Sequence, residues 1–243
     1  GEGTEIIKTF NYVKENDPNI SSGMRLSQPN YTHRSSNIIL DDGAIPGIKY
    51  SCDYEIHQSS STAPLGSSGG SPVYYKTVIE NIGEFGNSGK VIHNFNVVTD
   101  IGNISYPFAP RFDMDWARGK LVNKKIYKFD RDQNKHVLQQ EIINEYNEFM
   151  DNPDNSKVFW GLKVGYTATG VDLGYVNNYD PLQFEKFFVW EYFPIFSKWM
   201  YQTKRIEKNY DLNNPANYST KTTEYIYDNQ DHAQITRIRT SES

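Results

Sequence analysis

The sequence predicts an all-β fold of twisted antiparallel sheets built from hairpins, with little helix. Short runs of β-branched and aromatic residues alternate with polar ones along the chain, and clusters of Asn, Asp, Gly, Ser or Pro bound these runs. The chain has 18 Tyr, 13 Phe and 4 Trp, which bring large apolar areas. Its hydrophobic fraction of 37% is modest, and this balance is typical of sheets with one solvated face.

Ten runs have the strand pattern, and we expect strands at residues 5–13, 73–81, 91–98, 121–129, 137–149, 158–167, 186–193, 200–210, 221–227 and 235–240. Turn formers lie between runs, at 16–19, 41–43, 83–89, 152–155 and 213–215. The stretch 59–71 is rich in Ser and Gly, and we expect an exposed, flexible loop because it has too little apolar surface to offset chain entropy. Residues 1–243 are expected to form a single β-rich module, a fragment of a longer chain.

Residues 137–150 admit two interpretations. Leu138, Ile142, Tyr146 and Met150 recur every four residues, which fits one face of a helix. The same spacing fits one face of a strand, because four is a multiple of two. The β-branched pair at 142–143 favours the strand, which would form a hairpin with 121–129.

Charge and cysteine content exclude several classes. The formal net charge of -5 leaves no basic surface for a phosphate backbone, so we expect no nucleic-acid partner. Cys52 is the single cysteine, which excludes an internal disulfide and any multi-cysteine metal site. No stretch has the roughly 20 apolar residues that a membrane-spanning helix needs. We therefore expect no direct membrane span.

Three runs end alike, with an aromatic residue followed by Asp and more turn formers. The pairs are Phe129-Asp130, Tyr210-Asp211 and Tyr227-Asp228. An Asp that opens a turn accepts hydrogen bonds from backbone N–H groups two residues on, while the aromatic ring packs over the neighbouring strand. We expect each pair to close one strand of a hairpin.

With these endings the chain resembles the Rhs or Tyr-Asp-repeat proteins, in particular the large exported Rhs-like proteins of Gram-negative bacteria. The resemblance also rests on the ordered segments 64–75 (PLGSSGGSPVYY), 86–91 (GNSGKV), 116–121 (WARGKL) and 222–238 (TTEYIYDN through TRI). It implies strands that wrap or stack into a shell or scaffold. It also implies location at the cell surface or outside the cell, with the periplasm as the alternative, and partners among other protein chains or the rest of its own longer chain.

Asp130, Asp132, Asn134 and Glu141 have side-chain oxygens and match the first, third, fifth and twelfth positions of a calcium loop. Lys135 stands at the sixth position, where the sharp turn needs Gly. We therefore expect a solvated hairpin turn at this place, and no cofactor, with calcium as the alternative.

Other motifs have the residue types of catalysis but a context that disfavours it. Residues 66–70 (GSSGG) have the spacing of a nucleophilic serine, yet Pro64 and Pro72 replace the strand and helix that such a serine needs. Asp113 and Asp115 flank Met114 and resemble paired carboxylates that cleave sugars; in a strand they would share a face. We expect no enzyme, with a carbohydrate-active enzyme or sugar-binding module as the alternative.

The densest aromatic cluster spans 184–201, and its candidates for interaction are Phe187, Trp190, Phe193 and Trp199. We expect a buried core here, because alternating aromatics fill wide sheet interiors. In an open sheet the cluster would instead be a docking face. The sequence thus predicts a non-catalytic structural or binding module, with an accessory or plug-like subunit of an outer-membrane secretion complex as an alternative.

Overall fold

The computed structural model describes residues 5–26, 28–40, 49–62, 71–102, 105–148, 157–166, 188–229, 232 and 234–243. In these residues the regular elements are strands, apart from two short 3-10 helices, η1 (Glu84–Gly86) and η2 (Asp115–Ala117). The prediction of an all-β, antiparallel fold is confirmed.

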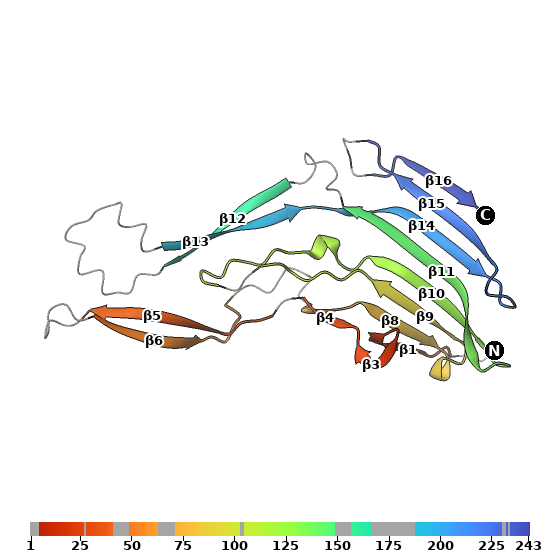
Figure 1. Cartoon of the computed structure of the whole chain (residues 1–243), viewed down its shortest axis with the longest axis horizontal. Helices are drawn as coiled ribbons and strands as arrows, with labels where there is room; N and C mark the ends of the chain where they lie inside the picture. The colour runs from red at the N-terminus through yellow and green to blue at the C-terminus, as the bar shows by residue number, and fades with distance from the viewer. Residues whose placement is uncertain are drawn as a thin grey trace.

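One open eight-stranded sheet forms the body of the molecule (Figure 1). Its strands, in spatial order, are β1 (Lys8–Asn11), β8 (Thr77–Ile82), β9 (Gly89–Phe95), β10 (Leu121–Asp130), β11 (Lys135–Glu148), β14 (Met200–Tyr210), β15 (Tyr218–Ile226) and β16 (Arg237–Glu242). Every neighbouring pair is antiparallel. Among the described strands, the sheet therefore has two open edges, at β1 and at β16.

Four smaller strand pairs complete the fold. They are β2 (Val13–Lys14) with β3 (Asp17–Ser21), β4 (Gly23–Arg25) with β7 (Val73–Tyr75), β5 (Thr32–Leu40) with β6 (Lys49–His57), and β12 (Lys157–Tyr166) with β13 (Phe188–Ser197). The pairs β5–β6 and β12–β13 extend as two arms beyond the same end of the sheet, away from both chain termini (Figure 1).

Each of the ten predicted runs contains a strand, and β14 has the predicted bounds. The run 137–149 is the strand β11, so the strand interpretation is confirmed, as is its hairpin with β10. The run 73–81 is broken at Lys76, because β7 pairs with β4 whereas β8 pairs with β1 and β9. No strand was predicted at the positions of β3, β4, β5 and β6. Residues 63–70, 41–48 and 149–156, with the serine motif and two predicted turns, lie outside the described residues.

The aromatic-Asp endings close strands as expected. Phe129 contacts His136 and Tyr210 contacts Tyr218, each across a hairpin, with ring centroids 5.1 and 5.3 Å apart. Asp130 Oδ1 accepts the backbone N–H of Asp132 at 2.9 Å, and Asp211 Oδ1 accepts that of Asn213 at 2.9 Å.

The third ending differs. The Tyr227 ring lies 4.6 Å from that of Tyr201 on the neighbouring strand, as predicted. Asp228, however, accepts a hydrogen bond from Arg237 Nη2 at 3.1 Å and from the Thr236 hydroxyl, both across the turn. This carboxylate thus ties β15 to β16.

The described residues form a thin core. The aliphatic side chains that are less than 9% exposed are Leu26, Val91, Ile92, Ala109, Ala117 and Ile142, among the residues whose burial the structure describes. Val91 and Ile142 lie on one face of the central sheet, and Ile92 lies on the other, as the register shows. Over the face of Ile92, Glu15 of the β2–β3 turn contacts Asn94 and Lys125.

The connection between β9 and β10 is held by a buried ion pair. The side chains of Arg118 and Asp100 are 1% and 0% exposed, and Arg118 Nη2 donates to Asp100 Oδ1. The same carboxylate oxygen accepts the backbone N–H of Met114 at 3.2 Å, and the N–H of Asp100 donates to the carbonyl of Leu26 at 3.3 Å. A buried charge needs such partners, so this pair anchors the connection to the body.

Candidate interaction surface

The β12–β13 arm exposes an apolar face. Alternate residues of the two strands share this face, and three rows of the register bring Trp160 beside Pro194, Leu162 beside Tyr192, and Val164 beside Trp190. We name the five exposed members the hairpin patch: Trp160, Leu162, Val164, Trp190 and Tyr192. Each is between 49% and 67% exposed. An apolar cluster this exposed is a candidate interaction surface.

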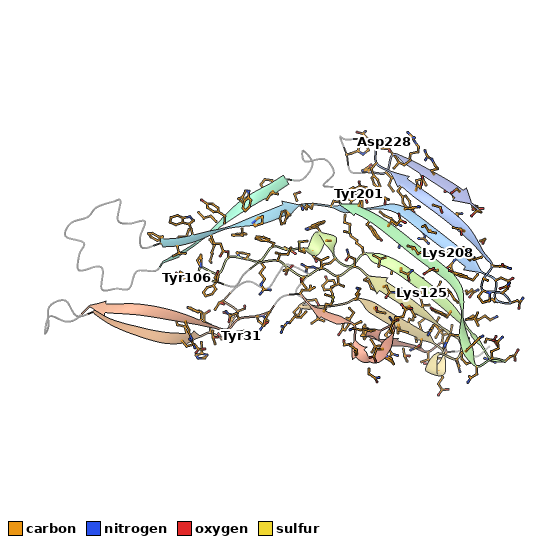
Figure 2. All side chains as sticks on the ribbon, viewed as in Figure 1. Tyr31, Tyr106, Lys125, Tyr201, Lys208 and Asp228 are labelled. Atoms are coloured by element: carbon orange, nitrogen blue, oxygen red, sulfur yellow. The ribbon has the colours of Figure 1, made fainter. Side chains whose placement is uncertain are left out.

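The opposite face of the arm contacts the body at Gly165. A Cβ atom added at Gly165 would lie 2.5 Å from Tyr106 Cζ, so the Tyr106 ring rests directly on the backbone there. Phe193 covers Gly161 on the same face. Tyr106 lies in the region between the two arms (Figure 2), and Phe108 beside it contacts His33 of the other arm, with ring centroids 5.0 Å apart. Gly165 thus allows the arm to pack on the connection through the face opposite the hairpin patch.

The patch ends at the base of the arm. Pro194 is buried, and the Phe196 ring meets the edge of Phe112 at a centroid distance of 6.3 Å. Lys198 lies over the rings of both Phe196 and Trp116, at 4.6 and 5.0 Å. Contacts of this kind fix the base of the arm to the body.

The eight-stranded sheet has charged side chains on both faces. One row crosses Lys125, Glu141 and Lys208 on neighbouring strands, and Lys208 Nζ lies 4.0 Å from Glu141 Oε2. Figure 2 shows Lys125 and Lys208 on this sheet. A second row on the same face crosses Glu145, Lys204, Glu224 and Arg239. Opposite charges in neighbouring strands attract, so these rows hold the strands in register.

The row at Lys125 continues beyond the sheet. Glu15, in the turn between β2 and β3, accepts a hydrogen bond from Lys125 Nζ at 2.7 Å. This hydrogen bond raises the pKa of Lys125, against the effect of burial. On the opposite face, Lys8 lies 2.7 Å from Glu80 and His93 lies 3.4 Å from it. The hydrogen bond from Lys8 is the main cause that lowers the pKa of Glu80.

The edge strand β16 is exposed over its whole length. It pairs with β15 on one side, and its other side meets no strand among the described residues. An open edge presents backbone N–H and C=O groups to which a further strand can pair. Arg237 and Arg239 on this strand have acidic partners on the β15 side, Asp228 at 3.1 Å and Glu224 at 3.4 Å.

The four aromatic interaction candidates do not form one surface. Trp190 belongs to the hairpin patch, whereas Phe193 lies on the opposite face of β13. Trp199 lies at the base of the arm, in a cluster with Tyr201 and Tyr227 at 5.2 and 5.6 Å. Phe187 lies outside the described residues. The expectation of a buried core is wrong for Trp190, which is 52% exposed, because no second layer among the described residues covers this side of the arm.

Trp160, Leu162 and Val164 were not among the interaction candidates predicted from the sequence. Their signal was present, since apolar residues occupy every second position from 158 to 164 and the residues between them are Phe159, Gly161 and Lys163. A strand with this pattern presents one uniformly apolar face. The buried pair of Asp100 and Arg118 left no sequence signal, because it joins residues 18 positions apart through the path of a loop.

The calcium-loop positions are spread along the hairpin of β10 and β11. Asp130, Asp132 and Asn134 lie at the turn, where Asn134 adopts φ 50° and Asp130 Oδ1 also accepts the N–H of Gln133 at 3.2 Å. Glu141 lies inside β11, opposite Lys125, and accepts hydrogen bonds from Asn123 Nδ2 at 3.0 Å and the Tyr210 hydroxyl at 3.2 Å. The predicted hairpin turn is confirmed. Among the described residues no three His, Cys, Asp or Glu side chains group as metal ligands.

Asp113 and Asp115 do not lie in a strand, contrary to the expected geometry. Asp113 Oδ1 accepts the N–H of Asp115 at 2.8 Å, which favours a turn that leads into η2. Both carboxylates approach the buried Arg118, at 3.4 Å and 3.9 Å. The pair therefore surrounds a guanidinium that Asp100 already neutralises.

A cleft lined by aromatic rings lies beside β7. Its cavity of about 620 Å³ is lined by Tyr12, Ser71, Val73, Tyr74, Tyr75, Val78, Phe95 and Gly119. The rings of Tyr12 and Tyr75 are 4.5 Å apart, and both residues are partly exposed. Rings that line a shallow cleft offer flat apolar faces to a ligand, with phenol hydroxyls at the rim.

Searches of protein-family models, curated proteins and solved structures return no match to this chain. Within the described part of the chain, no helix is both long and apolar enough to cross a membrane.

Proposed function

We propose that the chain is a non-catalytic structural or binding module of an exported, Rhs-like cell-surface protein, and that it engages other protein chains. The observation that carries this proposal is the division of its surface. The sheet has ion pairs on both faces, whereas the hairpin patch brings five exposed apolar side chains together on one face of the arm. A surface divided in this way suits a rigid support with a separate contact area.

The sheet is suited to the role of support. Its strands follow one another along the chain in β8–β9–β10–β11 and in β14–β15–β16, so most neighbouring strands of the sheet are also neighbours in chain order. Charged rows on one face and the Lys8, Glu80 and His93 group on the other keep both faces compatible with water. Such a sheet needs no second layer, which fits the wall of a shell or scaffold.

Site-specific photo-crosslinking in the producing cell tests the binding role. A photoreactive residue replaces Trp190 on the hairpin patch, Ile238 on the β16 edge, or Gln133 in an exposed turn as the control. Trp190 and Ile238 are 52% and 59% exposed, so the probes are accessible. We expect crosslinks to protein chains from the first two positions and few from Gln133. Equal or absent crosslinking at all three positions would contradict the binding role.

Protease treatment of intact cells tests the location. Digestion of the chain on intact cells, at a dose that spares a periplasmic marker, is the expected result for a surface protein. Digestion only after the outer membrane is opened would move the protein to the periplasm. Protection in both conditions would contradict export.

We propose, as a second function, that the aromatic cleft binds sugar, because pyranose rings stack on exposed tyrosine faces. Thermal shift with a panel of oligosaccharides tests it. Stabilisation that Tyr75→Ala removes and Asp113→Asn keeps would support a binding cleft. Stabilisation that requires Asp113 would favour the carboxylate pair instead, and the absence of any shift would reject sugar binding.

A further inference from the structure

We infer that the hairpin patch is a homodimer interface, in which the β12–β13 arm of one copy packs face to face with that of a second copy. This inference rests on the proposed binding function and names the partner. It draws on three properties of the patch: its lack of charge, the sizes of its paired side chains, and its area.

The patch contains no charged group that would oppose a second copy. In the three rows of the patch, the shared face carries only Trp160, Pro194, Leu162, Tyr192, Val164 and Trp190. The charged residues of the same segment, Lys163 and Glu191, pair with each other in the register and lie on the opposite face. A symmetric interface brings each patch against a copy of itself, so an ionised side chain near the axis would meet a like charge. This face avoids that repulsion.

Side-chain size makes the patch complementary to itself. Each row pairs a bulky residue with a smaller one: Trp160 with Pro194, Tyr192 with Leu162, and Trp190 with Val164. A two-fold axis parallel to the strands places β12 of one copy over β13 of the other and keeps the rows aligned. Tyr192 then meets Leu162 of the second copy, and Trp190 meets its Val164. Sheets packed face to face bring their side chains together in this manner, about 10 Å apart.

The area is sufficient for a weak dimer. The three aromatic members of the patch are 52–67% exposed, and its two aliphatic members are 49% and 52% exposed. An aromatic side chain buries ~150–250 Å², so the patch offers roughly 500–600 Å² per copy. Two copies bury ~1,000–1,200 Å², at the lower end of specific interfaces. We expect a dissociation constant on the order of 10 µM.

Sedimentation velocity of the chain from about 1 to 200 µM measures this equilibrium. We expect a shift from monomer to dimer across this range, and a stronger dimer at high salt, since each copy carries a net charge of -5 that salt screens. Trp190→Glu should be monomeric at every concentration. The control Ile195→Glu, on the opposite face and similarly exposed at 53% against 52%, should dimerise as the parent does.

A complementation test establishes the geometry. In the two-fold arrangement Leu162 of one copy faces Tyr192 of the other, so Leu162→Lys and Tyr192→Glu should each be monomeric alone. A mixture of the two should form a heterodimer, because the new lysine meets the new glutamate while the other Leu162–Tyr192 contact keeps its parent residues. Circular dichroism confirms that each variant is folded.

Three results would overturn the homodimer: a parent chain that stays monomeric at 200 µM, equal loss of dimer in Ile195→Glu, or no complementation in the mixture. A monomer whose Trp190 probe still captures a different protein, or a lipid vesicle, would assign the patch to that partner and reject the second copy. The proposed binding function fails when Trp190 and Ile238 crosslink to protein chains no more than the control position Gln133 does.

Discussion

The eight-stranded sheet and the β12–β13 arm are both antiparallel, yet their faces differ. On the sheet, acidic and basic residues alternate from strand to strand, and the few buried aliphatic side chains, such as Ile92 and Ile142, lie beneath them. On the arm, the hairpin patch has no charge and is about half exposed or more. The same antiparallel pairing thus carries charged faces in the sheet and an exposed apolar face on the arm.

This difference follows from the number of neighbours that each strand has. An inner strand of the sheet has a strand on both sides, so long Lys, Arg and Glu side chains from the neighbours cover its apolar residues. A strand of a two-stranded arm has one neighbour, and an isolated hairpin is marginal in water. The arm therefore depends on the connection that carries Tyr106 on one face, and exposes the other.

The largest expected effect concerns the connection between sheet and arm. Asp100→Ala leaves the Arg118 guanidinium, 1% exposed, without its main partner. We expect a loss of about 3–5 kcal/mol in the free energy of unfolding, measured by urea denaturation. Asp115→Asn, which removes a carboxylate that is 46% exposed and 3.9 Å away, should cost less than about 1 kcal/mol. Equal costs would mean that Asp100 and Arg118 do not anchor the connection.

The next experiment compares sheet and arm directly. Ile142→Ala removes a side chain that is 8% exposed, between β10 and β14, and should cost about 2–4 kcal/mol. Leu162→Ala removes a side chain that is 52% exposed and should cost less than about 0.5 kcal/mol at a protein concentration where the chain is monomeric. Urea denaturation at 1 µM measures both. A large cost at Leu162 in the monomer would show that the arm is covered by its own chain.

The sequence predicts where the strands lie better than it predicts which of their faces are buried. Apolar alternation located the strands of the sheet, and the aromatic-Asp pairs at 129–130 and 210–211 marked where β10 and β14 end. The strand β5 was missed because its first half, THRSSN, is polar and lacks that alternation. The surface was harder to predict, since the same alternating aromatics signal a buried core or an open face. A buried core and an open face are distinguished by whether a second layer covers the strand. Trp190 is exposed because no second layer of described residues covers it.

The dependence of stability on pH tests the ion pairs around Glu80. The Lys8 hydrogen bond lowers the pKa of Glu80 below its ordinary value of 4.5, so the folded state favours the ionised form. Its contribution to stability is present above about pH 4.5 and is lost as the pH falls through the lowered pKa. Glu80→Gln should cost about 1 kcal/mol at pH 7 and flatten the decline in stability between about pH 5 and pH 3. Glu84→Gln, in the exposed turn η1, is the control and should leave that decline unchanged.

The smallest effect distinguishes the interior of the sheet from its edge. A double-mutant cycle on Glu224 and Arg239 measures their coupling, which we expect at about 0.2–1 kcal/mol because the two side chains are 43% and 64% exposed. Salt at about 1 M shortens the screening length to about 3 Å and should remove most of it. The matched interior pair, Glu141 and Lys208, is 16% and 28% exposed and should keep more of its coupling in salt. If both pairs kept equal coupling in salt, β16 would be shielded from solvent and would not be an open edge. The contrast with the interior of the sheet would then hold for the arm alone.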